Sequence, residues 1–204
     1  MSAFKRIRVL ECIRQGQIGG GESHLLSLVE NIDRTKFDPV VLSFTDGRMI
    51  ERLNKLGIET TIIDTVKPFA IRTSTRVPKW IRSGKFDLLH AHSTRANSNI
   101  LWAARSLGIP VVYTIHGWSF HDDQNSLVKR IRVLGEKYLT SKSTLNISVS
   151  QSNKETCQFE GNGGRAGGLN NGIEVKIFNP ERKVKNIRRD LHILENAKLV
   201  LFLA

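Results

Sequence analysis

Short apolar runs rich in β-branched residues alternate along the chain with longer amphipathic segments. This alternation is typical of repeated strand and helix units, whose strands form a parallel sheet. The pattern predicts six strands, at Ile7–Ile13, Pro39–Phe44, Thr60–Ile63, Leu88–His92, Val111–His116 and Leu145–Val149. We therefore expect an α/β domain with a mainly parallel sheet flanked by helices.

The spacing of apolar residues between these strands predicts helices that turn one face to the core. One helix is expected over Glu22–Ile32, with its stripe at Leu25, Leu28, Val29 and Ile32, and another ends at Gly108. A third is expected over Ser126–Thr140, with its stripe at Leu127, Ile131, Leu134 and Tyr138. We expect this third stripe to face the core and Lys129 and Arg132 to face solvent.

The C-terminal part of the sequence has a different character. Gly161–Gly168 is too rich in glycine for a helix or a central strand, which predicts a loop. After Asn179-Pro180, the charged stretch Glu181–Asp190 predicts an interdomain linker that leads into a helical turn. At 204 residues the chain is long enough for one α/β domain and a short remainder, so we place the domain at 1–180 and the remainder at 181–204.

The chain is strongly basic, with 31 Lys and Arg residues against 19 Asp and Glu residues and a net charge of +12. This charge favours anionic partners such as phosphate-bearing ligands and acidic membrane surfaces. Nucleic acid is not an expected partner, because the basic residues are spread along the chain and match no nucleic-acid motif. Lys129, Arg130 and Arg132 suggest reversible binding to an anionic membrane, with a solvated helix face as the alternative.

No apolar run approaches the roughly 20 residues that span a bilayer, so no transmembrane helix is expected. The first apolar run contains Glu11 and is followed by Arg14, which does not fit a signal peptide. We therefore expect a cytoplasmic protein, peripheral at the inner face of the membrane if it binds lipid. Cys12 and Cys157 have no metal-site or redox spacing and are interpreted as reduced structural residues.

The ends of the predicted strands carry the polar residues that suggest chemistry, and parallel α/β sheets bind ligands outside the carboxyl ends of their strands. The first strand leads into Gly19, Gly20, Gly21 and Glu22, the fourth ends at His92 and Ser93, the fifth at His116 and Gly117, and the sixth at Ser150. We expect these residues to line one edge of the sheet.

Gly19 to Gly21 precede a predicted helix, whose backbone N–H groups attract an anion or a sugar hydroxyl. A tight turn that only lets helix and strand pack closely is the alternative. The dinucleotide fingerprint fits poorly, because His24 stands where a third glycine is required and the second strand lacks the ribose-binding acid. A nicotinamide-dependent oxidoreductase is therefore disfavoured.

Histidines provide the candidate chemistry of this edge. His116 should emerge from the fifth strand into the cleft, where an imidazole donates a hydrogen bond or acts as an acid or base. His90 and His92 share one side of their strand, and we expect His92 to lie nearer the rim. Because no carboxylate stands in an evident register with them and no zinc-site spacing occurs, no metal site is expected.

Several of these segments together resemble a large family of retaining glycosyltransferases that includes bacterial mannosyltransferases and sucrose-phosphate synthases. The resembling segments are the Gly19–Glu22 loop, Phe86–His92, Pro110–Gly117, Ile147–Ser150, Asn171–Glu174 and Phe178–Pro180. The resemblance implies a Rossmann-like domain that forms the N-terminal half of a two-domain (GT-B) fold. It also implies that His116 contacts the transferred sugar, and that the glycine loop and rim hold the acceptor and approach the donor phosphates.

The family's donor-binding half is not represented in this sequence. Its Arg, Lys and paired glutamates are missing, and Lys198–Ala204 resembles only its first strand. Asn171 and Gly172 resemble the turn before the crossing between the two halves. We expect hexosyl transfer from a sugar nucleotide to a glycan or lipid-linked acceptor, without other cofactors, and no activity without a donor domain, which a separate chain could supply. A non-catalytic module that binds an acceptor or anion is the alternative.

Overall fold

We describe the protein from a computed structural model that covers residues 5–65, 67–70, 75–121, 123–159, 166–172, 175, 179, 181, 187–194 and 196–200. The chain divides into two compact units, Met1–Asn171 and Gly172–Ala204. The first unit ends earlier in the chain than the boundary we placed at residue 180, which stays a prediction. In the second unit the described structure includes one short helix, α7 (Ile187–Asp190).

The first unit alternates strands and helices. Its strands are β1 (Ile7–Ile13), β2 (Phe37–Ser43), β3 (Glu59–Ile62), β4 (Leu88–His92), β5 (Val111–Ile115), β6 (Leu145–Ser148) and β7 (Ala166–Gly168). Its helices are α1 (Gly20–Asn31), α2 (Arg48–Lys55), α3 (Arg76–Gly84), α4 (Thr94–Ser106), α5 (Ser126–Lys142) and α6 (Gln151–Phe159). The order β3-β2-β1-β4-β5-β6-β7, with every pair parallel, confirms the predicted fold class.

The strand order reverses direction between β1 and β4, and this point fixes where a ligand is expected. Strands β2 and β3 extend the sheet on one side of β1, and β4 to β7 extend it on the other. At such a switch point the loops after the two central strands diverge and leave a crevice at their carboxyl ends. The loops after β1 and β4 therefore frame the candidate site.

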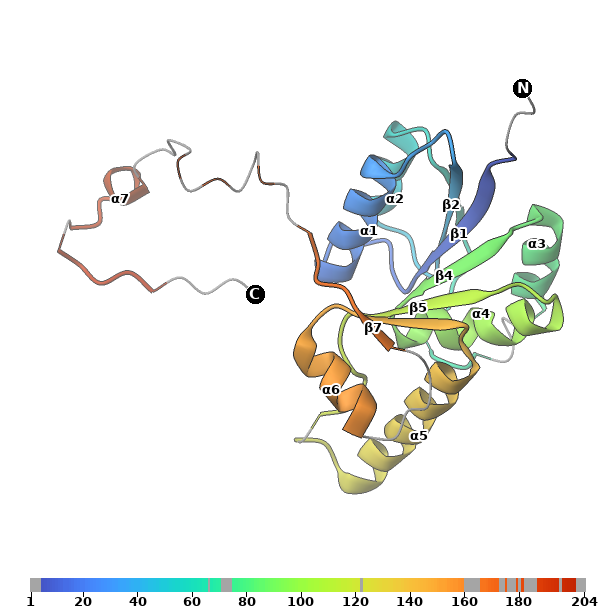
Figure 1. Ribbon diagram of the computed structural model, residues 1–204. Helices are drawn as coiled ribbons and strands as arrows, with labels where there is room; N and C mark the ends of the chain where they lie inside the picture. The colour runs from blue at the N-terminus through green and yellow to red at the C-terminus, as the bar shows by residue number, and fades with distance from the viewer. Residues whose placement is uncertain are drawn as a thin grey trace. The chain divides into compact units, whose positions relative to one another are not determined.

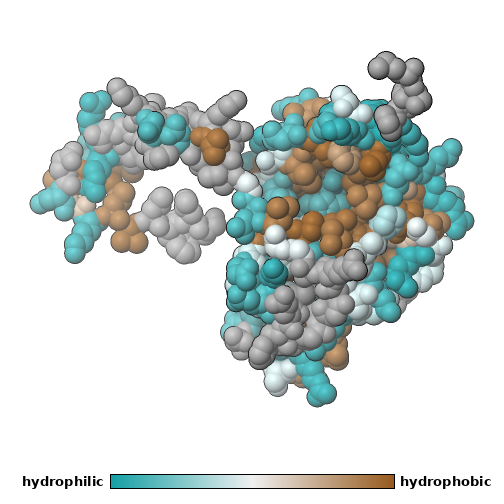
Figure 2. All heavy atoms as spheres, in the orientation of Figure 1, coloured by the Kyte–Doolittle hydropathy of each residue, from teal (hydrophilic) through white to brown (hydrophobic). Residues whose placement is uncertain are grey.

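Two apolar layers pack against the sheet, and Figure 1 shows α1 and α2 on one side and α3 and α4 on the other. Successive side chains of β1 point to opposite faces of the sheet and so pack in different layers. Leu10 and Cys12 belong to the larger apolar cluster, and Ile13 belongs to the smaller one. The helices do not cover the sheet completely on the β4 and β5 side of β1. Leu88 and Val112 are only half-buried, and Figure 2 shows apolar atoms exposed over the middle of the sheet.

Some elements differ from the sequence prediction. The glycine-rich segment predicted as a loop ends in strand β7, which pairs in parallel with β6; glycine is compatible with this position at the edge of the sheet. In Lys198–Ala204, which resembles the first strand of the donor-binding half, Lys198, Leu199 and Val200 form no strand, and residues 201–204 lie outside the described part of the chain. Helix α7 coincides with the predicted helical turn.

Helix α5 is rotated relative to our prediction. The stripe expected in the core is exposed, with exposed fractions of 66% for Leu127, 61% for Ile131, 58% for Leu134 and 47% for Tyr138. The opposite side carries Glu136, which is fully buried. Its carboxylate accepts hydrogen bonds from Thr94 Oγ1 at 2.7 Å and Tyr113 Oη at 3.0 Å. This buried carboxylate network, together with Leu139 and Val133 in the apolar core, holds this side of α5 against the domain, so the stripe faces outward.

The loops after β1 and β2 meet at two glycines, Gly16 and Gly47. A Cβ atom added to Gly16 would lie 2.7 Å from the backbone N of Gly47, and one added to Gly47 would lie 2.4 Å from the backbone C of Gly16. Met49 N also donates a 2.7 Å hydrogen bond to Gly16 O. Neither position has room for a side chain, and this contact fixes the start of the loop that carries Gly19 to Gly21.

We expect Gly16→Ala and Gly47→Ala each to lower the free energy of unfolding by about 1–3 kcal/mol, because the added methyl group meets backbone that cannot move aside. Gly20→Ala is the control, since nothing lies within 4 Å of a Cβ atom at that position. Urea unfolding monitored by circular dichroism measures the difference. Equal stability of the Gly47→Ala and Gly20→Ala proteins would contradict this account of the loop contact.

Candidate active site at the carboxyl edge of the sheet

The glycine loop and His116 lie at the same edge of the sheet. A Cβ atom added to Gly21 would lie 3.5 Å from His116 Cδ2, so the imidazole packs directly on the start of α1. His92 ends β4 and Ser93 follows it, while His116 follows β5 and is itself followed by the exposed Gly117. The structure therefore brings Gly21, His92 and His116 together.

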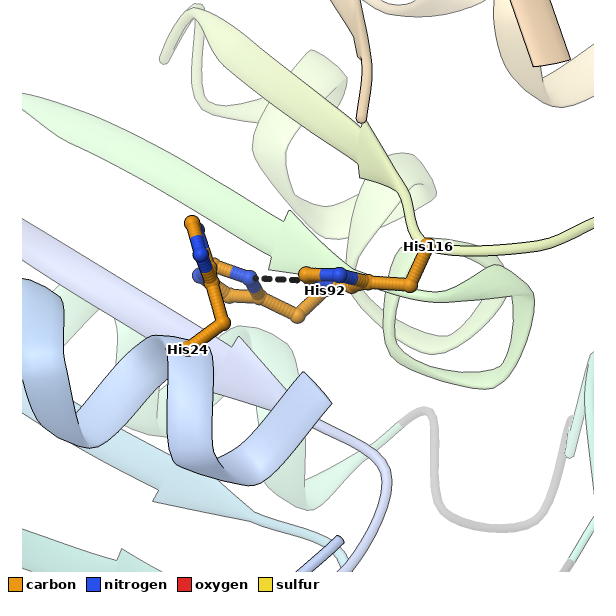
Figure 3. Close-up of side chains that lie close together, drawn as sticks. All are labelled: His24, His92 and His116. Atoms are coloured by element: carbon orange, nitrogen blue, oxygen red, sulfur yellow. Dashed lines mark hydrogen bonds between the residues drawn. The ribbon is translucent and has the colours of Figure 1, made fainter. Parts of the chain in front are cut away.

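A hydrogen-bonded chain runs from the interior of the sheet to His116. His90 Nδ1 and His92 Nε2 both lie 2.9 Å from Glu11 Oε2. His92 Nδ1 lies 3.1 Å from His116 Nε2, and Figure 3 shows the two rings joined by this contact. At the inner end, His90 Nε2 lies 2.8 Å from Thr114 Oγ1. Glu11 and His92 are fully or almost fully buried.

The register of the central strands creates this chain. Glu11 of β1 lies opposite His90 of β4, and Ile13 lies opposite His92. Because side chains alternate between the faces of a strand, Glu11, His90 and His92 point to the same face of the sheet. Our expectation that no carboxylate stands in register with these histidines was therefore wrong. The pairing of β1 with β4 could not be read from the spacing of these residues along the chain.

The protonation states follow from the geometry. Burial raises the pKa of the Glu11 carboxyl, but the attraction of His90 and the hydrogen bonds from both histidines outweigh it and lower the pKa below its usual range. Burial, together with the nearby charge of His90, lowers the pKa of His92 to about 3. Burial, with His24 and His90 nearby, lowers the pKa of His116 to about 4. At neutral pH, Glu11 is therefore ionised and His92 and His116 are neutral.

These states fix the tautomer of His116. An ionised carboxylate can only accept, so His92 donates from Nε2 and its Nδ1 must be an acceptor. His116 consequently donates from Nε2 to His92 Nδ1, and its own Nδ1 carries a lone pair. With a pKa near 4, His116 is suited to accept a hydrogen bond from a hydroxyl rather than to transfer protons near neutral pH.

His24 completes the cluster, and our sequence analysis did not assign it a role. It lies on α1, three residues after Gly21, and its ring centroid is 5.0 Å from that of His116 and 5.8 Å from that of His92 (Figure 3). Burial and the charge of His90 lower the pKa of His24. The helical periodicity that predicted α1 also places residue 24 on the turn nearest the rim, which is the signal that could have found it.

Glu22 does not line the open rim as expected, because its side chain is buried. Its Oε2 atom would lie 2.7 Å from a Cβ atom added to Gly19, the residue that precedes α1, and its Oε1 lies 3.8 Å from Arg14 Nε. A carboxylate in the first turn of a helix interacts favourably with the helix dipole. Glu22 therefore stabilises the start of α1, and Gly20 remains open to a ligand.

The other predicted site residues are Ser150, Asn171 and Gly172. Ser150 follows β6 and accepts a 3.2 Å hydrogen bond from Asn153 N at the start of α6. Asn171 is exposed at the end of the first unit, and Gly172 belongs to the second unit. Among the described residues of the first unit, no hydrogen bond or ring contact joins Ser150 or Asn171 to His116.

Two groups of side chains have donor atoms close enough to share a metal ion: His24, His92 and His116, and Glu11, His90 and His92. Both ring nitrogens of His92 already have hydrogen-bond partners, Nε2 with Glu11 and Nδ1 with His116. Cluster geometry alone therefore does not require an ion, and a site without metal stays our prediction.

Residues 18–176, which contain Gly19 to Gly21, His92 and His116, match the family described as Glycosyltransferase Family 4. The chain belongs to that family. It is 28% identical over 195 residues to the UDP-Gal:alpha-D-GlcNAc-diphosphoundecaprenol alpha-1,3-galactosyltransferase of Escherichia coli, a match that covers 88% of this chain and 48% of the relative. The family resemblance predicted from the sequence is thereby confirmed.

Solved structures have the same fold at low sequence identity. The Anabaena protein HepE, solved with UDP-glucose, superposes with a TM-score of 0.71 at 19% identity, covering 92% of this chain and 50% of HepE. The sucrose-phosphate synthase of Thermosynechococcus elongatus gives a TM-score of 0.61 at 14% identity, covering 92% of this chain and 53% of the synthase. The chain thus spans about half the length of the relatives it matches, which have the expected GT-B architecture.

Among the described helices, none is both long and apolar enough to cross a bilayer.

The lowered pKa values of the histidines predict how stability depends on pH. Between pH 6.5 and about 4 the unfolded chain binds protons that folded His92 and His116 do not, so the folded state loses stability as the pH falls. Each histidine contributes a slope of up to about 1.4 kcal/mol per pH unit. We expect His116→Gln to have a shallower slope in this range, as measured by urea unfolding at several pH values.

His192→Gln is the control for this measurement, because His192 is exposed and lies in the second unit. Its slope should equal that of the unchanged protein. An unchanged slope in His116→Gln would mean that His116 is not held in its neutral form.

Proposed function

We propose that this chain is the acceptor-side half of an enzyme that transfers a hexosyl group from a sugar nucleotide to a glycan or lipid-linked acceptor. The neutral His116 at the switch-point edge carries the proposal, with the glycine loop beside it and Glu11 and His92 fixing its tautomer. In this role His116 Nδ1 accepts a hydrogen bond from a hydroxyl of the transferred sugar. The donor nucleotide is bound by a second domain, in a longer form of the chain or in a separate chain.

Two relatives support the substrate classes. The name of the E. coli relative describes a UDP-galactose donor and a diphosphoundecaprenol-linked acceptor, and HepE was solved with UDP-glucose. The donor and acceptor of this chain belong to the same classes in our proposal, and the particular sugar remains open. No metal takes part, because His116 and backbone amides supply the polar contacts.

Glycosyl transfer with radiolabelled UDP-galactose and UDP-glucose tests the proposal. We expect no transfer by the 204-residue chain alone, and transfer by the chain fused to the donor-binding half of a related family 4 enzyme. His116→Ala in the fused protein should lower kcat/KM by about 100-fold or more, the usual cost of losing one transition-state contact. Thermal unfolding of the variant checks that the fold is retained.

Two outcomes would contradict this proposal in different ways. Turnover by the isolated chain that His116→Ala abolishes would mean that the donor is held by the first half. Acceptor binding without transfer in any fused protein would favour the alternative, a non-catalytic module.

We further propose that the protein lies peripherally at an anionic membrane surface on the cytoplasmic side, with α5 as the contacting element. The exposed stripe Leu127, Ile131, Leu134 and Tyr138 would enter the interface between headgroups and acyl chains, as amphipathic helices do. Arg130, which is exposed beside the stripe, would attract acidic headgroups. This arrangement differs from the sequence prediction, in which only the basic residues faced the membrane.

Co-sedimentation with vesicles that contain acidic lipid tests this surface. Replacing Leu127 and Leu134 by Ser should weaken binding about tenfold or more at both low and high salt, because the lost contribution is apolar. Arg130→Gln should weaken binding at low salt only, because its contribution is screened. Leu56→Ser, at another exposed leucine, is the control. No binding at low salt, or equal loss in the control, would refute the membrane proposal.

A further inference from the structure

A groove adjoins the histidine cluster on the side of α5. It has a volume of about 490 Å³ and lies between the residues that follow β4, the loop after β5 and helix α5. Ser93 and Gly117, the residues after His92 and His116, both line it. A ligand in the groove would therefore extend to the edge where His116 lies.

Three arginines from separate parts of the fold line this groove. Arg14 follows β1, Arg95 lies in the first turn of α4 and Arg132 lies on α5. Their charges have little compensation: Arg14 reaches Glu22 only at 3.8 Å, and Arg132 donates a 2.6 Å hydrogen bond to a backbone carbonyl, Ser119 O. Within the described part of the chain, no carboxylate forms an ion pair with Arg95 or Arg132. The groove is thus a cationic site.

Electrostatic crowding in the groove points the same way. Burial and the neighbouring charge of Arg14 lower the pKa of Arg95. Neighbouring guanidinium groups whose charges are only weakly compensated by carboxylates are stabilised by an anion that bridges them.

Two residues that line the groove, Ser93 and Trp118, also have a buried polar atom without a partner. Ser93 Oγ and Trp118 Nε1 are buried, and neither has a hydrogen-bond partner among the described residues. Trp118 is only 9% exposed. Buried donors normally have partners, so an unpartnered indole N–H in a cationic groove suggests an acceptor supplied by a ligand.

Ser93 also has a strained backbone. Its φ of 84° and ψ of 161° fall in a region that is almost restricted to glycine, and it immediately precedes α4. This conformation starts α4 at the groove, so the free amides of its first turn add to the attraction for an anion. Strain of this kind persists where surrounding structure enforces it and is concentrated at functional sites.

The outer end of the groove is apolar. Ile131 lines the groove and also belongs to the exposed stripe of α5, with Leu127 and Leu134 on the same side of the helix. A ligand that fits both parts carries a compact anion at one end and a hydrocarbon chain at the other.

We propose that this groove binds the diphosphate of a lipid-linked acceptor. Arg14, Arg95 and Arg132 would hold the diphosphate, and the hydrocarbon chain of the lipid would extend out of the groove over Ile131 and along α5. The inference rests on the proposed function and assigns the acceptor subsite within it. The sugar carried by the diphosphate then reaches towards Gly117 and His116. The diphosphate of a sugar nucleotide shares the same anion chemistry, but a nucleoside lacks a hydrocarbon chain that would contact the apolar end of the groove.

Isothermal titration at low salt, with the 204-residue chain, separates these sources by using four probes: farnesyl diphosphate, inorganic pyrophosphate, farnesol and UDP. We expect farnesyl diphosphate to bind at least about tenfold more tightly than each of the others. Arg95→Gln and Arg132→Gln should each weaken its binding about tenfold or more, since each removes a charge-assisted contact. Ile131→Ser should weaken the binding of farnesyl diphosphate and leave the binding of pyrophosphate unchanged.

Arg105→Gln is the matched control, because Arg105 lies on the same helix as Arg95 but at its far end. Thermal unfolding of every variant shows whether the fold is kept, and Arg14→Gln replaces any variant that loses it. If farnesol binds as tightly as farnesyl diphosphate, the site is purely apolar, and if UDP does, it is a nucleotide site. Either result overturns the inference. So does an unchanged affinity for farnesyl diphosphate in both Arg95→Gln and Arg132→Gln.

Failure of this inference can be distinguished from failure of the proposed function. Binding is measured without a donor. If the chain binds farnesyl diphosphate but no fused protein transfers a sugar, the inference stands and the proposed transferase function is refuted. Conversely, transfer to a lipid-diphosphate acceptor with unchanged kcat/KM in Arg95→Gln and Arg132→Gln supports the enzyme and refutes the inference.

Discussion

The buried carboxylate of Glu11 is the constraint on which the candidate site depends. An ionised group in the middle of a sheet is costly unless hydrogen bonds compensate it, and here two imidazoles donate to one oxygen. The same contacts join β1 to β4 at the switch point and leave His92 with one acceptor nitrogen. His116 then has one possible tautomer, so the chemistry at the rim is determined by a charge that no ligand touches.

A second buried carboxylate, Glu136, organises the other side of the rim. It connects α5 to Thr94 at the start of α4, to Tyr113 of β5 and, through a 3.3 Å contact with Ser119 N, to the loop after β5. This network determines the rotation of α5 and so the position of Arg132 and Ile131. The two halves of the site therefore meet at the β4–α4 turn, where His92 belongs to one network and Thr94 to the other.

The sequence predicted the elements better than it predicted their contacts. Strands β1 and β4 have the predicted bounds, because short, mainly apolar runs between amphipathic segments are a strong local signal. The Glu11 pairing depends on strand order, which the local pattern does not contain. The orientation of α5 was predicted incorrectly for a related reason. Periodicity identifies an apolar stripe, but the side that faces the domain carries Glu136 with its three partners and the core residues Leu139 and Val133. The family motifs located His92 and His116, whereas Glu11 and His24 belong to no motif that we used.

The contact between Gly16 and Gly47 has a consequence for how the site can respond to its ligands. Backbone lies against backbone there, so neither loop can slide without opening a gap that no side chain can fill. The glycine loop thus has little freedom for induced fit. Changes of shape on ligand binding should then come from elements that lack such an anchor, and motions on the microsecond to millisecond timescale should be reduced at Gly16 and Gly47.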